Sequence, residues 1–268
     1  MKIRMIGDHS DYHCGSAAAF QAICAEVRRH GRIVDVDDSN YDLLVVNGEG
    51  SMHHDSKLCR DKMSHIQNAL DTGRRAVLIN TVWQDNSRKY AELLVRCDHV
   101  VAREVCSAYE LANIGIQAEV KMDLAFSCEI EDVEPVDFNG AVLVTDFYSK
   151  EFGTFARLTG KWAEKFVYID LREWTWSLLV RSMASASLLI TGRHHAVYAA
   201  CKARLPFLAM EGNTHKISGL IQTAGSNVPV FHNFSDLKSN LLWPRKNYSS
   251  YNDLFHWMHR QSPWRLVN

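Results

Sequence analysis

The stretch Leu188-Leu189-Ile190-Thr191-Gly192-Arg193-His194-His195-Ala196-Val197 decides the fold of this 268-residue chain. An apolar run ends at Thr191-Gly192, and small and apolar residues then continue to Ala203, which predicts a buried strand followed by a helix. The turn between them carries Arg193 and two histidines. A helix N-terminus offers unpaired N–H groups and a partial positive charge. Together with the guanidinium, it predicts a binding site for a phosphate or carboxylate.

The same alternation of strand and helix patterns extends along most of the chain. Strands are predicted at residues 3–6, 33–36, 43–46, 76–80, 99–102, 118–120, 141–144, 166–169, 187–190 and 207–210. Helices are predicted at residues 16–30, 57–72, 87–95, 105–113, 152–165, 173–186, 195–203 and 216–223, with two more after residue 233. Such regular alternation indicates parallel sheets covered by helices.

One segment interrupts this alternation. Residues 129–140 are acidic and contain a proline and a glycine, which is typical of a linker. We therefore predict an α/β fold with two Rossmann-like domains, at residues 1–128 and 141–232, that face each other across a cleft. Residues 233–268 would form a helical tail that packs back on the first domain. In open α/β sheets, ligands bind outside the carboxyl ends of the strands, so residues that directly follow strands are the best site candidates.

Composition excludes several classes of protein. The net charge is -1, the hydrophobic share 47% and the charged share 23%, as in an ordinary globular protein without the basic field that nucleic acid requires. Seven scattered cysteines without a C-x-x-C motif predict reduced, mostly buried thiols in a cytoplasmic protein. The N-terminus reads as a strand rather than a secretory signal, and no run approaches the ~18 apolar residues of a membrane span.

Three motifs lie in order between residues 41 and 222. They are Val46-Asn47-Gly48-Glu49-Gly50-Ser51, then Val101-Ala102-Arg103-Glu104-Val105-Cys106-Ser107 with the later Asp123-Leu124-Ala125-Phe126, and finally Thr191-Gly192-Arg193-His194-His195-Ala196 with the later Lys216-Ile217-Ser218-Gly219-Leu220. In order and spacing they resemble the polysaccharide pyruvyl transferase family. The third motif is the most specific of the three.

The resemblance implies a GT-B-like fold and a reaction on bacterial or fungal surface glycans. It implies that pyruvate is taken from phosphoenolpyruvate and installed as a ketal across two sugar hydroxyls, with no cofactor besides the donor. It also implies that Arg193 and His195 match the Arg-x-His motif of the family and that Lys216 matches its helix-start lysine. The chain departs from the family at Glu49, because the centre of that loop is usually glycine.

Phosphoenolpyruvate carries a phosphate and a carboxylate, so its binding requires fixed cations. We assign Arg193, Arg103 and Lys216 to the donor, with His194 beside them, because arginine suits bidentate contacts with anions and lysine acts as a point charge. His195 is the predicted group for proton transfer, since an imidazole titrates near neutral pH. An ordinary ion pair is the alternative interpretation of both Arg103 and Asp123.

Glu49 is the predicted base for the acceptor hydroxyl, since flanking glycines let a ligand approach the backbone closely. Pairing with an arginine or capping a helix is the alternative. Other residues predicted to line the cleft or bind the acceptor are Gly48, Gly50, Ser51, His53, Gly15, Ser16 and Asp123. A metal site at His53-His54-Asp55 is a weaker interpretation, because adjacent histidines point apart and no further ligands are evident; we predict no metal.

Two other functions are compatible with these residues. A glycosyltransferase using an acidic sugar linked to cytidine monophosphate would also need Arg193, His195 and Lys216. Glu49 favours this alternative, because a carboxylate would repel a small dianionic donor. A non-catalytic glycan-binding module is the third candidate, and it predicts that the three cationic side chains do not share one pocket.

The C-terminal segment 241–268 combines aromatic and basic residues. It contains three tryptophans and has a formal charge of +3; the residues concerned are Trp243, Trp257, Trp264, Arg245, Lys246, Arg260 and Arg265, opposed by Asp253. Such a segment suits peripheral contact with the inner face of a membrane that bears a lipid-linked glycan acceptor. The alternative is a tail that packs against the protein.

Overall fold

The computed structural model describes residues 1–146 and 166–266, which divide into two compact units. The first contains Met1–His9, Ala19–Ser127 and the residues from Ser262 onward. The second contains Ser10–Ala18 and Cys128–Gln261. The helix predicted at residues 152–165 lies outside the described residues.

The first unit is built on a parallel sheet with the strand order β2-β1-β3-β4-β5-β6. Its strands are β1 (Lys2–Ile6), β2 (Arg32–Val34), β3 (Leu43–Glu49), β4 (Arg75–Thr81), β5 (His99–Ala102) and β6 (Glu119–Val120). Its helices are α1 (Cys14–Arg28, which starts in the second unit), α2 (Lys57–Asp71), η1 (Arg88–Tyr90), α3 (Ala91–Val95), α4 (Val105–Asn113) and η2 (Leu124–Ser127).

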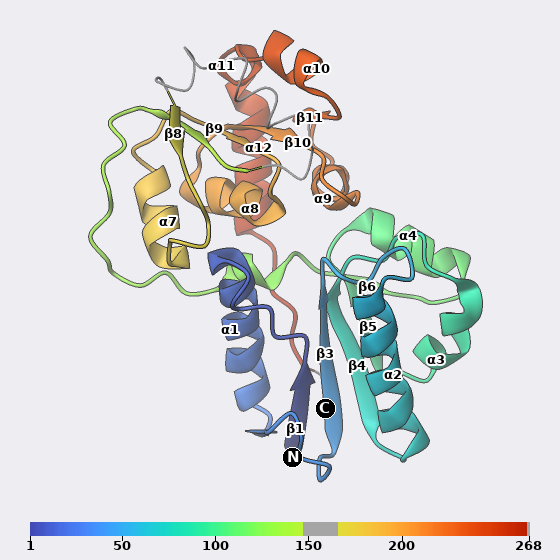
Figure 1. The fold of residues 1–268 in the computed structure, drawn as a ribbon. Coiled ribbons are helices and arrows are strands. Elements are labelled where there is room, and N and C mark those ends of the chain that lie inside the picture. The colour runs from blue at the N-terminus through green and yellow to red at the C-terminus, as the bar shows by residue number, and fades with distance from the viewer. Residues whose placement is uncertain (147–165, 267–268) are drawn as a thin grey trace. The chain divides into compact units, whose positions relative to one another are not determined.

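Strand β3 is buried along its whole length because helices cover both faces of the sheet. Leu43 and Val45 belong to a core that includes Ile23 of α1, whereas Leu44 and Val46 belong to a core that includes Met63 of α2. Successive side chains of a strand point to opposite faces, so α1 and α2 lie on opposite sides of the sheet, as Figure 1 shows.

The second unit is built on a parallel sheet with the strand order β11-β10-β9-β7-β8. Its strands are β7 (Val142–Val144), β8 (Phe166–Tyr168), β9 (Leu188–Thr191), β10 (Phe207–Met210) and β11 (Val230–Phe231). Its helices are α7 (Trp176–Met183), α8 (His194–Ala203), α9 (Lys216–Thr223), α10 (Phe234–Ser239), α11 (Trp243–Lys246) and α12 (Tyr248–His259). Figure 1 shows α7 and α8 side by side.

The predicted fold class is confirmed: two parallel sheets are flanked by helices. Several elements match their predicted bounds, among them α4, α9 and β10. The helix predicted at 87–95 divides into η1 and α3, and the two-residue strand β11 was missed. The predicted linker is tied to α7, since backbone N–H groups of Glu131 and Val136 donate to the hydroxyls of Ser177 and Ser182.

The C-terminal segment differs from the predicted tail at 233–268. It contains three helices rather than two, and they belong to the second unit. The Tyr251 hydroxyl of α12 donates to the carbonyl of Phe207 in β10. The residues after Gln261 belong instead to the first unit, where Trp264 is 2% exposed and the N–H of Leu266 donates to Glu26. The packing of residues near the C-terminus therefore decides which parts of the chain belong to each unit.

Candidate functional site

The two sheets have the same strand topology. In each sheet there is one point from which successive strands are added in opposite directions. In the first sheet this point lies between β1 and β3, and in the second between β7 and β9. Open α/β sheets bind ligands outside the carboxyl ends of the strands at such a point. Glu49 ends β3, while Asp146 and Arg193 follow β7 and β9. Glu49 and Arg193, both predicted site residues, thus lie where the topology places binding sites.

The loop after β3 holds Glu49 in an unusual backbone conformation. Its φ is +44°, a left-handed value that costs a residue with a side chain on the order of 1 kcal/mol. The N–H and hydroxyl of Ser51 both donate to the carbonyl of Gly48, at 3.2 and 2.8 Å, which closes the turn. Gly48 is required because a Cβ there would lie 2.4 Å from Oγ1 of Thr81. Glu49 itself is only 6% exposed.

Lys62 of α2 contacts this loop and was not predicted from the sequence. Its Nζ donates to the carbonyls of Asn47 and Gly48, at 2.6 and 3.1 Å, and to Oγ of Ser51 at 2.7 Å. It also lies 2.9 Å from Nε2 of His9. Burial lowers the pKa of Lys62 to about 8, and the charge of Glu49 opposes that shift.

The spacing of apolar residues in α2 could have identified Lys62 from the sequence. This lysine follows Cys59 by three residues and precedes Ile66 by four, so it occupies the apolar face of α2. A lysine at a core position of an amphipathic helix needs a polar partner. Here the loop after β3 supplies that partner.

Arg103 and Asp123 form a buried ion pair in the first unit. Nη1 of Arg103 lies 2.8 Å from Oδ2 of Asp123, and the side chains are 1% and 0% exposed. Oδ1 of Asp123 accepts the N–H of Ala125 at 2.9 Å. The geometry favours the ion-pair interpretation of both residues. Nε of Arg103 is buried without a hydrogen-bond partner in the described part of the chain, so its role toward the donor stays a prediction.

In the second unit, Arg193 precedes α8 as its N-cap residue. Its Nε donates to both carboxylate oxygens of Asp146 at 2.8 Å, and its Nη2 pairs with the same carboxylate. Its Nη1 donates to the Tyr12 hydroxyl at 2.6 Å, and the guanidinium lies 5.5 Å from the centre of the Tyr12 ring. A carboxylate and an aromatic ring therefore fix the guanidinium at the start of the helix. Sequence reasoning missed Tyr12, although it follows β1.

His195 is enclosed by the segment Ser10–Ala18. Its ring lies edge-on to that of His13, with 4.9 Å between the centroids. A Cβ on Gly15 would lie 2.3 Å from Cβ of His195, so only glycine permits this approach. Nδ1 of His13 accepts the N–H of Ser16 at 3.2 Å. The structure thus brings Gly15 and Ser16, both predicted site residues, to His195.

The ring of His194 lies edge-on to that of His195, with 5.4 Å between the centroids, and it also packs on the ring of Tyr198, with 4.6 Å between the centroids. Lys216 begins α9, is 5% exposed and donates to Oδ1 of Asn213 at 2.7 Å. Since β9 and β10 are neighbours, Arg193 and Lys216 follow adjacent strands. Glu211 accepts the N–H groups of Ile217 and Ser218, which places a carboxylate at the amino end of α9. The start of α8 is therefore the better anion site.

The segment His53-His54-Asp55 connects two loops of the first unit. Nδ1 of His53 lies 2.9 Å from Nδ1 of His54, and Nε2 of His54 lies 3.2 Å from Asp85. Asp55 accepts the N–H of Ser87 at 3.0 Å. Within residues 1–146 and 166–266 no three potential ligands gather as a metal site. These contacts, with the bridge between His53 and Gln84, attach the loop after β3 to the one after β4.

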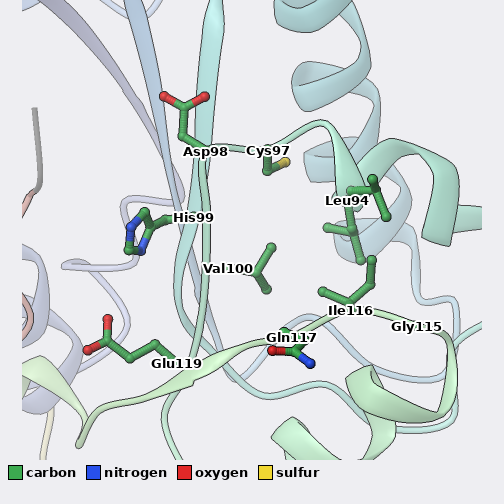
Figure 2. Close-up of a pocket in the computed structure, with 10 residues that line it drawn as sticks. Leu94, Cys97, Asp98, His99, Val100, Gly115, Ile116, Gln117 and Glu119 are labelled. Carbon is green, nitrogen blue, oxygen red and sulfur yellow. The ribbon is translucent and has the colours of Figure 1, made fainter.

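The first unit also has a pocket away from the Glu49 loop. The pocket in Figure 2, of about 400 Å³, is lined by His99 and Glu119 at the starts of β5 and β6, at the end of the sheet opposite Glu49.

All seven cysteines are free, and burial raises the pKa of Cys14 to about 12, which excludes a thiolate there at neutral pH. No helix in the described ranges is long and apolar enough to cross a bilayer.

The polysaccharide pyruvyl transferase family model matches residues 7–213. The chain belongs to the polysaccharide pyruvyl transferase family. The match includes Glu49, Arg103, Arg193 and His195, and Lys216 lies just beyond it. Membership makes the chain a transferase. No curated protein matches the chain in sequence.

Solved structures with the same fold are distant in sequence. An uncharacterized protein from Klebsiella pneumoniae has a TM-score of 0.63 at 11% identity, covering 87% of this chain and 92% of that chain. The S. aureus MnaA-UDP co-structure has a TM-score of 0.61 at 11% identity, covering 95% and 90%. A putative UDP-N-acetylglucosamine 2-epimerase from Listeria monocytogenes has 0.58 at 10% identity, covering 98% and 91%. The chain therefore shares the GT-B-like fold of these structures.

Proposed function

We propose that this transferase moves the pyruvyl group of phosphoenolpyruvate to two hydroxyls of a sugar in a surface glycan and releases phosphate. The observation that carries the proposal is the guanidinium of Arg193, fixed by Asp146 and Tyr12 at the amino end of α8. A fixed guanidinium at a helix N-terminus suits a donor with a phosphate and a carboxylate. Lys216, which follows the adjacent strand, supplies a second cation.

His195 protonates the methylene carbon of the donor while a sugar hydroxyl attacks C2. A second hydroxyl then displaces phosphate and closes the ketal. The first hydroxyl gives its proton to Glu49, and exchange with solvent then deprotonates Glu49 and reprotonates His195. The proton of the second hydroxyl leaves with phosphate. Contacts with His13 and Gly15 support the assignment, because they hold the imidazole in one orientation.

Glu49 accepts the proton of the attacking hydroxyl. The ammonium of Lys62, whose pKa the charge of Glu49 affects, lies under the same loop. A cation there offsets the repulsion between Glu49 and an anionic donor. Repulsion by Glu49 was the reason for preferring a donor sugar linked to cytidine monophosphate over phosphoenolpyruvate, and the cation weakens that reason. We place the reaction in the cytoplasm, in keeping with the free cysteines, and expect a glycan or lipid-linked glycan as the acceptor.

A thermal-shift panel with phosphoenolpyruvate, cytidine monophosphate and uridine diphosphate tests the donor. A ligand at ~100-fold excess over its Kd stabilises the native state by about 2.7 kcal/mol. We expect a shift with phosphoenolpyruvate in the wild type and a smaller one in Arg193→Lys, because lysine lacks the bidentate geometry. A shift with a nucleotide and none with phosphoenolpyruvate would instead identify a glycosyltransferase.

A further inference from the structure

The second unit carries a groove of about 830 Å³ at the amino ends of its central strands. Val142 and Leu188, the first residues of β7 and β9, line it together with Pro206, which precedes β10. The segment around α11 forms another wall; its lining residues are Leu241, Leu242, Pro244, Arg245 and Tyr248. Arg193 follows the carboxyl end of β9, so this groove is at the other end of the sheet.

Most residues that line the groove are apolar, and part of its lining is exposed. Leu242 is 62% exposed and Tyr248 is 47% exposed, and both lie at its rim. A single exposed leucine is ordinary on a protein surface. Two large exposed side chains beside a groove lined mostly by apolar residues indicate a surface that a partner covers.

The charge of the lining identifies the kind of partner. Arg204 and Arg245 are exposed and line the groove, and Lys246 is exposed beside it. Among residues 1–146 and 166–266, no aspartate or glutamate lines the groove. Burial lowers the pKa of His259, and Arg204 lowers it further, as expected where positive charge accumulates. The complementary partner has an apolar interior and a negatively charged surface.

We propose that this groove docks the chain on the surface of a bilayer containing anionic phospholipid. Leu242 and Tyr248 enter the acyl-chain boundary, while Arg204 and Arg245 contact the headgroups. Exposed apolar side chains with flanking cations favour a lipid surface. The interpretation of the C-terminal segment changes accordingly. Trp264 is 2% exposed, so this residue is structural rather than membrane-facing, and Arg265 pairs with Glu26 of the first unit.

Co-sedimentation of the full chain with vesicles tests the proposal. We expect binding to vesicles of phosphatidylcholine with phosphatidylglycerol, little binding to phosphatidylcholine alone, and weakening as salt is raised. Arg245→Glu should lower the partition coefficient at least about fivefold, and adding Leu242→Glu should abolish binding. Leu58→Glu is the matched control, because Leu58 is 52% exposed on α2 of the first unit.

Three outcomes would overturn the proposal. One is the absence of binding to the anionic vesicles by the wild type. Another is an equal loss of binding in Leu58→Glu. The third is self-association that Leu242→Glu removes without any vesicle binding, which would make the groove an interface between copies of the chain. Thermal melting shows that each variant is folded. None of these measurements uses turnover, so they are independent of the proposed reaction.

Discussion

Glu49 adopts the left-handed backbone conformation that glycine takes readily, in a loop where the family usually has glycine. We predict that Glu49→Gln abolishes turnover and leaves the thermal shift by the donor nearly intact, since only the proton acceptor is removed. Glu49→Gly should also lose turnover, yet raise the free energy of unfolding by up to about 1 kcal/mol, because the strain is relieved. Turnover assays and urea denaturation measure the two effects. Unchanged turnover in Glu49→Gln would remove this residue from the mechanism.

Lys62 makes stability depend on pH. Its pKa in the native state is about 8, below the ordinary 10.5, because burial disfavours the charged form. Between these two pH values the unfolded chain binds more protons, so the free energy of unfolding rises with pH. We predict a gain of at most about 3 kcal/mol from pH 8 to 10.5 that Lys62→Met lacks. Glu49, Cys59 and Arg103 also act on this group, so the comparison requires the exposed control Lys57→Met.

Asp146 orients the guanidinium of Arg193 through a bidentate contact. We predict that Asp146→Asn weakens donor binding by roughly tenfold or more, since hydrogen bonds to charged groups contribute about 1.5–3 kcal/mol. A rise in the KM for the donor with little change in kcat would support a positioning role. Tighter donor binding in the variant would mean that Asp146 competes with the donor for Arg193.

At the scale of elements, helix α1 begins in the second unit, and its first turn limits the position of His195. We predict that Gly15→Ala destabilises the protein by about 1–3 kcal/mol and lowers activity, because the new methyl group must displace the His195 side chain. Ala25→Gly, at an exposed position of the same helix, is the control. It should cost about 1 kcal/mol in helix propensity and leave turnover unchanged. Equal activity in the two variants would contradict the contact.

Local patterns predicted the elements, but not which of them meet. The apolar spacing of α4 with Gly115 after it, and the proline before β10, are signals within a few residues, and these elements were predicted to the residue. The contact of Tyr12 with Arg193 joins positions 181 residues apart, and no periodicity records it. Glu211 capping α9 also went unpredicted, since its partner amides follow a loop.

At the scale of the whole molecule, two sheets with the same strand winding each place their polar residues at the reversal of strand order. The alternation of strands and helices was sufficient to predict this arrangement, together with the loops carrying Glu49 and Arg193. It could not predict that Trp264 returns to the first unit after three helices of the second. Whether the C-terminal segment packs on the first unit depends on which hydrophobic core has space for the indole of Trp264. The shape of that core is set by many residues far apart in the sequence.

The returning C-terminal segment leads to a prediction for the stability of the first unit. Trp264 lies in the core with Ile3, Leu43 and Val101, so Trp264→Ala should lower the free energy of unfolding by about 3–5 kcal/mol. Trp257 is only half-buried on α12, and its replacement by alanine should cost less. Because the two units need not unfold together, the measurement follows amide hydrogen exchange in β1 and β3 against that in β9 and β10. Faster exchange confined to β1 and β3 would assign Trp264 to the first core, whereas uniform acceleration would mean that the two units unfold as one.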